Sequence, residues 1–176
     1  GPNYALLSRL PPHQLASLYS LIRGLWTNPP DHLPSPLAEA SIFLLPKKGD
    51  PLQAKNYRPI SLINSFPKLL AHFIQKAILD FLTERGWIHE AQSGFVRDRS
   101  TMDSVFDHLA HRYLHPSCLS IYLDLEKAFD SLPHSALLDL LCILNFPAHI
   151  VSLCRMLYRN LPAFVQIGTA KAPFQQ

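Results

Sequence analysis

One carboxylate in this chain stands where an apolar segment ends and a turn begins. Residues 120–131 read Ser-Ile-Tyr-Leu-Asp-Leu-Glu-Lys-Ala-Phe-Asp-Ser, so Asp124 follows an apolar run and precedes a sharp turn into a helix. Burying a carboxylate at the end of such a run is costly unless a cation compensates its charge. Because divalent cations such as Mg²⁺ prefer oxygen ligands, Asp124 is a candidate metal ligand. An aspartate that merely caps the turn after a buried strand explains this segment equally well.

Three further segments precede Asp124 and carry residues suited to binding phosphate or nucleic acid. They are residues 40–49 (Ala-Ser-Ile-Phe-Leu-Leu-Pro-Lys-Lys-Gly), 56–68 (Asn-Tyr-Arg-Pro-Ile-Ser-Leu-Ile-Asn-Ser-Phe-Pro-Lys) and 92–101 (Gln-Ser-Gly-Phe-Val-Arg-Asp-Arg-Ser-Thr). In this order and at these separations, the four segments resemble reverse transcriptases of non-long-terminal-repeat (LINE-type) retrotransposons. The resemblance covers roughly residues 13–176 of the chain.

The resemblance implies an RNA-directed DNA polymerase that copies RNA into DNA with two metal ions, Mg²⁺ or Mn²⁺. Asp124 matches the metal-binding aspartate of the family's palm motif A, and the carbonyl of Leu125 would be a further ligand. The family carries its second acidic pair on a later Asp-Asp hairpin, which is not among these 176 residues. We therefore expect two ions in the complete enzyme, weak or no metal binding by this fragment, and no primer extension by the fragment alone. A non-catalytic nucleic-acid-binding or protein-interaction module derived from a reverse transcriptase is the alternative.

An aromatic ring follows the candidate metal ligand at an offset of five residues. Phe129 matches the position where the family places a steric gate, a ring that leaves no room for the 2′-hydroxyl of a ribonucleotide. An ordinary core phenylalanine near a turn is the alternative. Asp130 is expected to be a turn or cap residue rather than a metal ligand.

Cationic residues gather in the first two segments. The resemblance assigns Lys47, Lys48 and Arg58 to nucleotide binding, with Arg58 contacting the incoming deoxynucleoside triphosphate and either lysine as its partner. A guanidinium fork and an ammonium point charge both suit a triphosphate. For each lysine, and for Lys55 nearby, a solvated loop position is about equally plausible.

The third segment is a basic loop that precedes a helix. The resemblance implies a template-binding role for Gln92, Gly94, Arg97 and Arg99, with the arginines on phosphates. A basic surface loop with a buried Phe95 is the alternative for the arginines.

Three histidines, His108, His111 and His115, follow at spacings that could suggest a metal site. Because no cysteine or carboxylate completes a ligand set at a convincing position, we interpret them as residues on a helix surface.

The pattern of apolar residues and breakers predicts an α+β fold. In the terms of the resemblance, this is the fingers of a right-hand polymerase (40–117) and part of its palm (118–176), after an N-terminal helical extension (3–39); Gly1-Pro2 is typical of a cleavage remnant. The predicted helices are 13–27, 65–85 with Gly86 as its C-cap, 101–114 beginning after Ser100, 133–144 and 148–160. The predicted strands are 40–46 and 57–62, joined by a hairpin-like loop, a central strand at 118–125, and 164–168. Pro59 suggests that 57–62 is an edge or irregular strand.

Composition permits these assignments without demanding them. The formal net charge of +3 and the pI of about 8.8 are compatible with a polyanionic partner. Cys118, Cys142 and Cys154 lie in apolar segments and are expected to be reduced core thiols. No apolar run approaches the length of a membrane span, so we expect no membrane partner.

The resemblance implies an RNA template, a DNA primer and deoxynucleoside triphosphates as partners. It also implies an intracellular protein, nuclear during target-primed synthesis and cytoplasmic as a ribonucleoprotein. The apolar edge of the predicted strand at 119–125 suggests self-association, unless residues 163–168 fold back to cover it.

Overall fold

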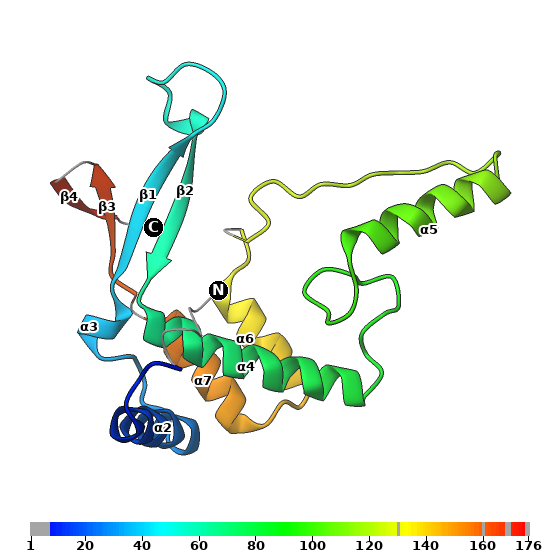
Figure 1. Ribbon diagram of the computed structural model, residues 1–176. Helices are drawn as coiled ribbons and strands as arrows, with labels where there is room; N and C mark the ends of the chain where they lie inside the picture. Colours follow the sequence, from blue (N-terminus) through cyan, green and yellow to red (C-terminus); the bar gives the residue numbers. More distant parts are fainter. Residues whose placement is uncertain (1–7, 130, 160, 168–169, 175–176) are drawn as a thin grey trace. The chain divides into compact units, whose positions relative to one another are not determined.

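The computed structural model describes residues 8–129, 131–159, 161–167 and 170–174 (Figure 1). The chain forms two compact units, one made of residues 1–75 and 138–176 and the other of residues 76–137. The predictions made for Gly1-Pro2, Asp130 and Gly168 lie outside the described residues.

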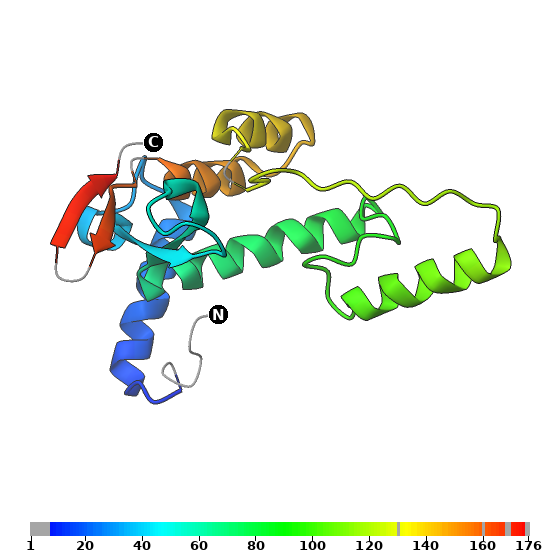
Figure 2. The same cartoon turned by 90° about the horizontal axis from the view of Figure 1, so that it is seen from above.

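A four-stranded mixed sheet organises the first unit, with the strand order β2-β1-β3-β4. β1 (Ala40–Pro46) and β2 (Tyr57–Ile63) form the predicted antiparallel hairpin. β3 (Ala163–Ile167) runs parallel to β1, as Figure 1 shows. β4 (Ala170–Phe174) runs antiparallel to β3 (Figure 2). β2 is an edge strand, as predicted from Pro59, which has no N–H to donate to a second neighbour. β4 has no counterpart among the predicted elements.

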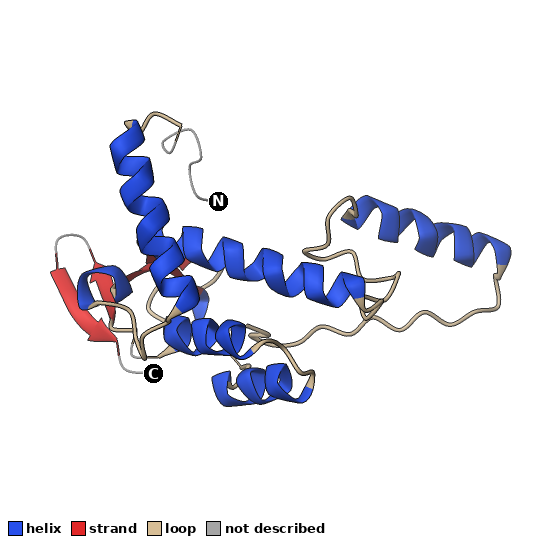
Figure 3. Ribbon diagram, turned by 90° about the horizontal axis from the view of Figure 1, so that it is seen from below, coloured by secondary structure: helices blue, strands red, loops and turns tan. Residues whose placement is uncertain are grey.

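Helices supply most of the buried core of the first unit (Figure 3). α2 (Pro12–Thr27) and α7 (Ala148–Tyr158) match their predicted spans closely, and α3 (Ser35–Ala38) is a single short turn. The fully buried side chains are Leu70 of α4, and Leu153 and Met156 of α7. β3 is the next described element after α7 along the chain.

Two polar contacts hold β3 and β4 at the start of β1. The backbone N–H of Ala40 donates to the carbonyl of Pro162 at 3.0 Å, which extends the pairing of β1 with β3. The Nζ atom of Lys171 lies 3.2 Å from a carboxylate oxygen of Glu39. The parallel neighbour of β1 is therefore fixed by backbone pairing, with only a small addition from an exposed ion pair.

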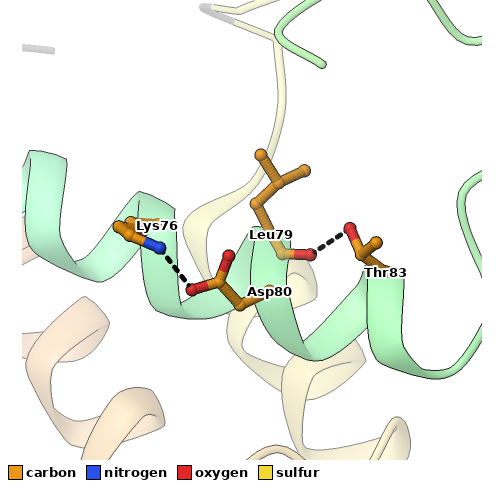
Figure 4. A network of polar contacts seen from close by, with 4 residues as sticks. All are labelled: Lys76, Leu79, Asp80 and Thr83. Atoms are coloured by element: carbon orange, nitrogen blue, oxygen red, sulfur yellow. Dashed lines mark hydrogen bonds and ion pairs between the residues drawn. The ribbon is translucent and has the colours of Figure 1, made fainter. Parts of the chain in front are cut away.

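α4 (Ser65–Glu84) begins in the first unit and ends in the second. On its exposed side, Lys76 Nζ lies 2.7 Å from Asp80 Oδ2, and the Thr83 hydroxyl donates to the Leu79 carbonyl at 2.7 Å (Figure 4). Gly86 ends the helix as predicted, with φ of +65°. The N–H groups of Gly86 and Trp87 donate to the carbonyls of Thr83 and Leu82, both at 3.0 Å, which is the Schellman arrangement.

α5 (Thr101–Leu114) begins at the predicted residue because Ser100 caps it. The Asp103 N–H donates to the Ser100 hydroxyl at 3.3 Å, and the Ser100 N–H donates to the Asp103 carboxylate at 2.8 Å. This reciprocal capping box lowers the pKa of Asp103, because the hydroxyl and the N–H of Ser100 both donate to its ionised carboxylate. α6 (His134–Ile143) later returns the chain from the second unit to the first.

The predicted central strand at 118–125 is wrong for this structure. These residues form a stretch without helix or strand, drawn as loop in Figure 3, and Leu119, Leu123 and Leu125 are all strongly exposed. A strand requires a neighbour for its backbone N–H and C=O groups, and none of the four described strands pairs with this stretch. The idea that residues 163–168 cover its edge is also wrong over the described 163–167, because β3 pairs with β1 and β4.

The cysteines only partly follow the prediction. All three are free thiols, but Cys118 and Cys142 are exposed and only Cys154 is buried. Burial raises the pKa of the Cys154 thiol to about 11. Cys118 begins the stretch that was wrongly expected to be a buried strand, which explains why it was expected in the core. Within the described residues, no helix combines the length and apolarity that a membrane crossing requires.

We predict opposite effects of alanine at two glycines of the first unit. Gly49 has φ of +131°, and a Cβ there would lie 2.7 Å from Asn56 Nδ2. Gly49→Ala should therefore destabilise the chain by about 1–3 kcal/mol. In the matched control, Gly24→Ala, the new methyl meets nothing within 4 Å in α2, and a gain of about 0.5–1 kcal/mol is expected. Urea denaturation of both variants is the measurement, and a Gly49→Ala protein as stable as the parent would contradict the account of this loop.

Candidate functional site

Asp124 lies in the second unit, directly before a tight turn. The turn spans residues 126–129, and the N–H of Ser131 donates to the carbonyl of Lys127 at 2.9 Å. Lys127 takes a φ of +50°, which is uncommon for a residue with a side chain. The carboxylate of Asp124 is exposed and forms no ion pair with any described residue. The expectation of a buried carboxylate is therefore wrong here, and the group is open to ligands.

Phe129 and Leu125 are exposed on the same turn. The ring of Phe129 is 83% exposed, so it does not lie in the core of this structure. Leu125 is also exposed, and it directly follows Asp124 in the chain. Asp124, Leu125 and Phe129 thus form one contiguous, accessible segment.

The oxygen atoms of Asp124 and Leu125 are of the type that binds a hard cation, but they are too few to complete a metal site. A carboxylate and a carbonyl oxygen are ligands that Mg²⁺ accepts. Across the described part of the chain, however, no three His, Cys, Asp or Glu side chains are grouped to hold a metal ion. A two-ion centre therefore does not fit the residues described here without further ligands.

The histidines occupy the surface of α5 and its end. The rings of His111 and His115 lie 4.7 Å apart between centroids, while His108 contacts Tyr122. No sequence pattern indicated that second contact, because it joins a helix residue to one 14 positions away in a stretch without helix or strand.

The β1–β2 hairpin presents its cations on an internally bonded loop. The Lys47 N–H donates to the Asn56 carbonyl at 2.6 Å, which continues the ladder one pair beyond the strands. The Asn56 amide donates to the Asp50 carbonyl at 2.8 Å, and the Tyr57 hydroxyl donates to the Pro51 carbonyl at 2.9 Å. These bonds fix residues 47–56 as a defined turn rather than a loose loop.

The register of the hairpin places Lys47 on the same face as Arg58. Arg58 pairs with Leu45, so both side chains lie on one face of the hairpin. Lys47 is two residues beyond Leu45 and continues the ladder through its bond to Asn56, which places it on that face. The guanidinium of Arg58 is exposed and has no carboxylate partner among the described residues. Arg58 and Lys47 thus form an unneutralised cationic pair.

The loop 86–100 uses its predicted template-binding residues in different ways. Arg99 donates from Nη1 to the carbonyls of His89 at 2.7 Å and Gln92 at 2.8 Å, so its guanidinium ties the loop together. The side-chain amide of Gln92 donates to the carbonyl of Gly94 at 3.0 Å. Arg97 is exposed and lies 3.4 Å from the carboxylate of its neighbour Asp98. Of the two arginines, only Arg97 is free to leave its contact without opening the loop.

The position of Phe95 contradicts the alternative of a basic surface loop with a buried phenylalanine. Its ring is 80% exposed and its φ is +60°, so a basic loop with a buried phenylalanine is not what forms. A non-glycine residue in this conformation is strained, and such strain is more common near functional sites than elsewhere.

A comparison with protein families decides the classification. The profile of the family described as reverse transcriptase (RNA-dependent DNA polymerase) matches residues 45–174. The chain belongs to the reverse transcriptase family. The matched range includes every residue assigned above to metal, nucleotide or template.

Curated relatives come from transposable elements. The chain is 35% identical over 142 residues to a transposon TX1 uncharacterized 149 kDa protein of Xenopus laevis, covering 77% of this chain and 11% of the relative. It is 32% identical over 105 residues to a probable RNA-directed DNA polymerase from transposon BS of Drosophila melanogaster, covering 57% of this chain and 12% of the relative. A retrovirus-related Pol polyprotein from type-1 retrotransposable element R2 of Popillia japonica is 30% identical over 110 residues, with coverages of 60% and 15%.

These matches identify the chain as part of a reverse transcriptase domain of the LINE type. It spans only a small part of the length of each of these relatives. The predicted α+β class is confirmed as a mixed fold with a small sheet. Members of the family act on nucleic acids and nucleotides with divalent metal ions.

We predict that Arg99 and Arg97 respond differently to alanine. Arg99→Ala removes two charge-assisted hydrogen bonds to carbonyls, worth roughly 1.5–3 kcal/mol each, and should expose the loop to chymotrypsin at Phe95. Arg97→Ala removes only an exposed ion pair of about 0–1 kcal/mol and serves as the control. Equal cleavage rates for the two variants would show that Arg99 does not hold the loop.

Proposed function

We propose that this chain is the fingers and first part of the palm of a LINE-type reverse transcriptase, and that the whole polymerase copies RNA into DNA from a DNA primer. The observation that carries the proposal is the family match across residues 45–174, which contains Asp124 in its predicted sequence context. The division into an N-terminal extension (3–39), fingers (40–117) and partial palm (118–176) belongs to the same proposal.

The proposed role of Asp124 is that of a metal ligand. Its exposed carboxylate, with the carbonyl of Leu125, would contribute oxygen donors to Mg²⁺, or to Mn²⁺ in its place. Because no three candidate ligand side chains are grouped within the described residues, further ligands are needed to complete the centre.

The proposed role of Arg58 and Lys47 is to bind the triphosphate of the incoming deoxynucleotide. They share one face of the hairpin, Arg58 lacks a carboxylate partner among the described residues, and the bonded loop limits the freedom of Lys47. A guanidinium donates two parallel hydrogen bonds to phosphate oxygens, while an ammonium adds a point charge. Lys48 lies in the bend beyond the hydrogen-bonded ladder, which makes it the weaker candidate of the two lysines.

Phe129 is proposed to exclude ribonucleotides. It is accessible and stands five residues after Asp124, so its ring can lie beneath a nucleotide sugar held at the metal. A ring in van der Waals contact with the sugar leaves no space for a 2′-hydroxyl.

The template is proposed to contact the loop 86–100, with Arg97 on a phosphate and Gly94 and Gln92 beside the strand. Arg99 would act by holding the loop in shape. For the whole polymerase we propose target-primed synthesis in the nucleus and a cytoplasmic ribonucleoprotein. Self-association through residues 119–125 stays a prediction that sedimentation over a range of concentrations can test.

Replacing Asp124 tests the proposed function in the polymerase that contains these residues. Asp124→Asn keeps the size of the side chain but removes its charge, so RNA-templated primer extension should fall below detection while RNA binding remains. Asp107→Asn, at another exposed aspartate of the second unit, is the control and should retain activity. An Asp124→Asn polymerase with parental activity would refute the assignment.

Arg58→Ala in the same polymerase should mainly raise the KM for deoxynucleotides. The lost charge-assisted contact is worth roughly 1.5–3 kcal/mol, which corresponds to an increase of about tenfold to a hundredfold. Lys55→Ala, also exposed on the hairpin, is the control. If Arg58→Ala leaves KM unchanged and lowers the melting temperature instead, Arg58 is structural.

Phe129→Val should raise the use of ribonucleotides while sparing that of deoxynucleotides, because the smaller side chain vacates the space of the 2′-hydroxyl. The ratio of kcat/KM for the two nucleotide classes is the measurement. Phe106→Val, at another exposed phenylalanine, should leave the ratio unchanged. An equal loss with both nucleotide classes in Phe129→Val would mean that the ring does not act as a gate.

A further inference from the structure

One side-chain contact connects the stretch that carries Asp124 to a helix. The hydroxyl of Tyr122 and Nε2 of His108 lie 2.6 Å apart. Their rings are 5.5 Å apart between centroids, with an interplanar angle of 66°, which is an edge-on arrangement. The pair therefore combines a short hydrogen bond with a favourable ring contact.

No other side-chain hydrogen bond within the described residues ties this stretch to another element. Within the described part of the chain, the bond between Tyr122 and His108 is the one by which a side chain of residues 119–125 reaches another element. No described strand pairs with this backbone, so a ladder does not fix its position. The helix that carries His108 is itself capped at Ser100, which gives the contact a defined support.

The spacing of Tyr122 and Asp124 makes the contact relevant to the carboxylate. Tyr122 lies two residues before Asp124 in the same unpaired stretch. Because so few bonds separate the two positions, a contact that holds the Tyr122 side chain also restricts the backbone that carries the Asp124 carboxylate.

We propose that His108 and Tyr122 are positioning residues for Asp124, acting through their hydrogen bond. The proposal rests on the proposed role of Asp124 in the polymerase. It gives a purpose to one of the histidines on α5, which the metal, nucleotide and template assignments leave unused. A small error in the position of a reacting group lowers the rate of the chemical step more than it lowers binding.

Kinetics of the whole polymerase provide the first test. Tyr122→Phe and His108→Ala should each lower kcat by about tenfold, with the deoxynucleotide KM and the RNA affinity unchanged. The double variant should lose no more than either single variant, because both remove one shared bond. His108→Gln, whose amide can both donate and accept, should recover part of the activity.

Matched controls separate positioning from a general effect on α5. Tyr113→Phe removes an exposed hydroxyl from the same helix, and His111→Gln changes a ring that faces His115 instead. Both should keep parental kcat. Parental kcat in Tyr122→Phe, or independent losses that multiply in the double variant, would overturn the proposal.

Nuclear magnetic resonance of the 176-residue chain tests the contact without activity. Tyr122→Phe should shift the ring ¹⁵N resonance of His108 but not that of His111, and His108→Ala should shift the backbone amide of Asp124. If these resonances do not move, the inference fails even in an active polymerase. If they move but the parental polymerase makes no DNA, the contact stands and the proposed function fails.

Discussion

The backbone pairing of strands is the constraint on which this structure depends. A strand persists only where its N–H and C=O groups find partners, and β1 (Ala40–Pro46) has two neighbours. β2 on one side carries Arg58 and the cationic loop, while β3 on the other brings in residues from the far end of the chain. The ladder therefore fixes the cationic hairpin, and with it the positions of the residues proposed to contact a triphosphate.

The stretch that bears Asp124 lacks that support. Its apolar side chains are exposed, and among the described residues its one side-chain hydrogen bond to another element is that of Tyr122 with His108. A turn follows in which Lys127 has a positive φ. A carboxylate proposed to bind a metal needs its position fixed by neighbouring groups. The hairpin is held by many backbone hydrogen bonds, whereas the stretch that carries Asp124 is held by one side-chain hydrogen bond. His108, which forms that bond, therefore matters more than its exposed position suggests.

Local signals in the sequence predicted most of the local structure. Ser100 and Gly86 marked helix ends because capping depends on nearby residues, and the apolar run before Lys47 predicted a hairpin because its return strand follows closely. The parallel pairing of β1 with β3 was beyond such reasoning, since the two strands are far apart in the sequence. The strand expected at 118–125 was wrong because composition indicates a tendency to pair but not the presence of a partner. The residues of the candidate site came from motif resemblance, and their geometry came from the structure.

The central claim is that Asp124 is a ligand of the metal that serves polymerisation. Cleavage by bound iron tests it most directly in the whole polymerase with its RNA template and DNA primer. Fe²⁺ that replaces Mg²⁺ generates hydroxyl radicals in the presence of ascorbate and peroxide, and these cut the polypeptide beside the metal. The account predicts cuts within residues 122–126 that excess Mg²⁺ suppresses. Metal-dependent cuts confined to other parts of the polymerase, with none in this range, would contradict it.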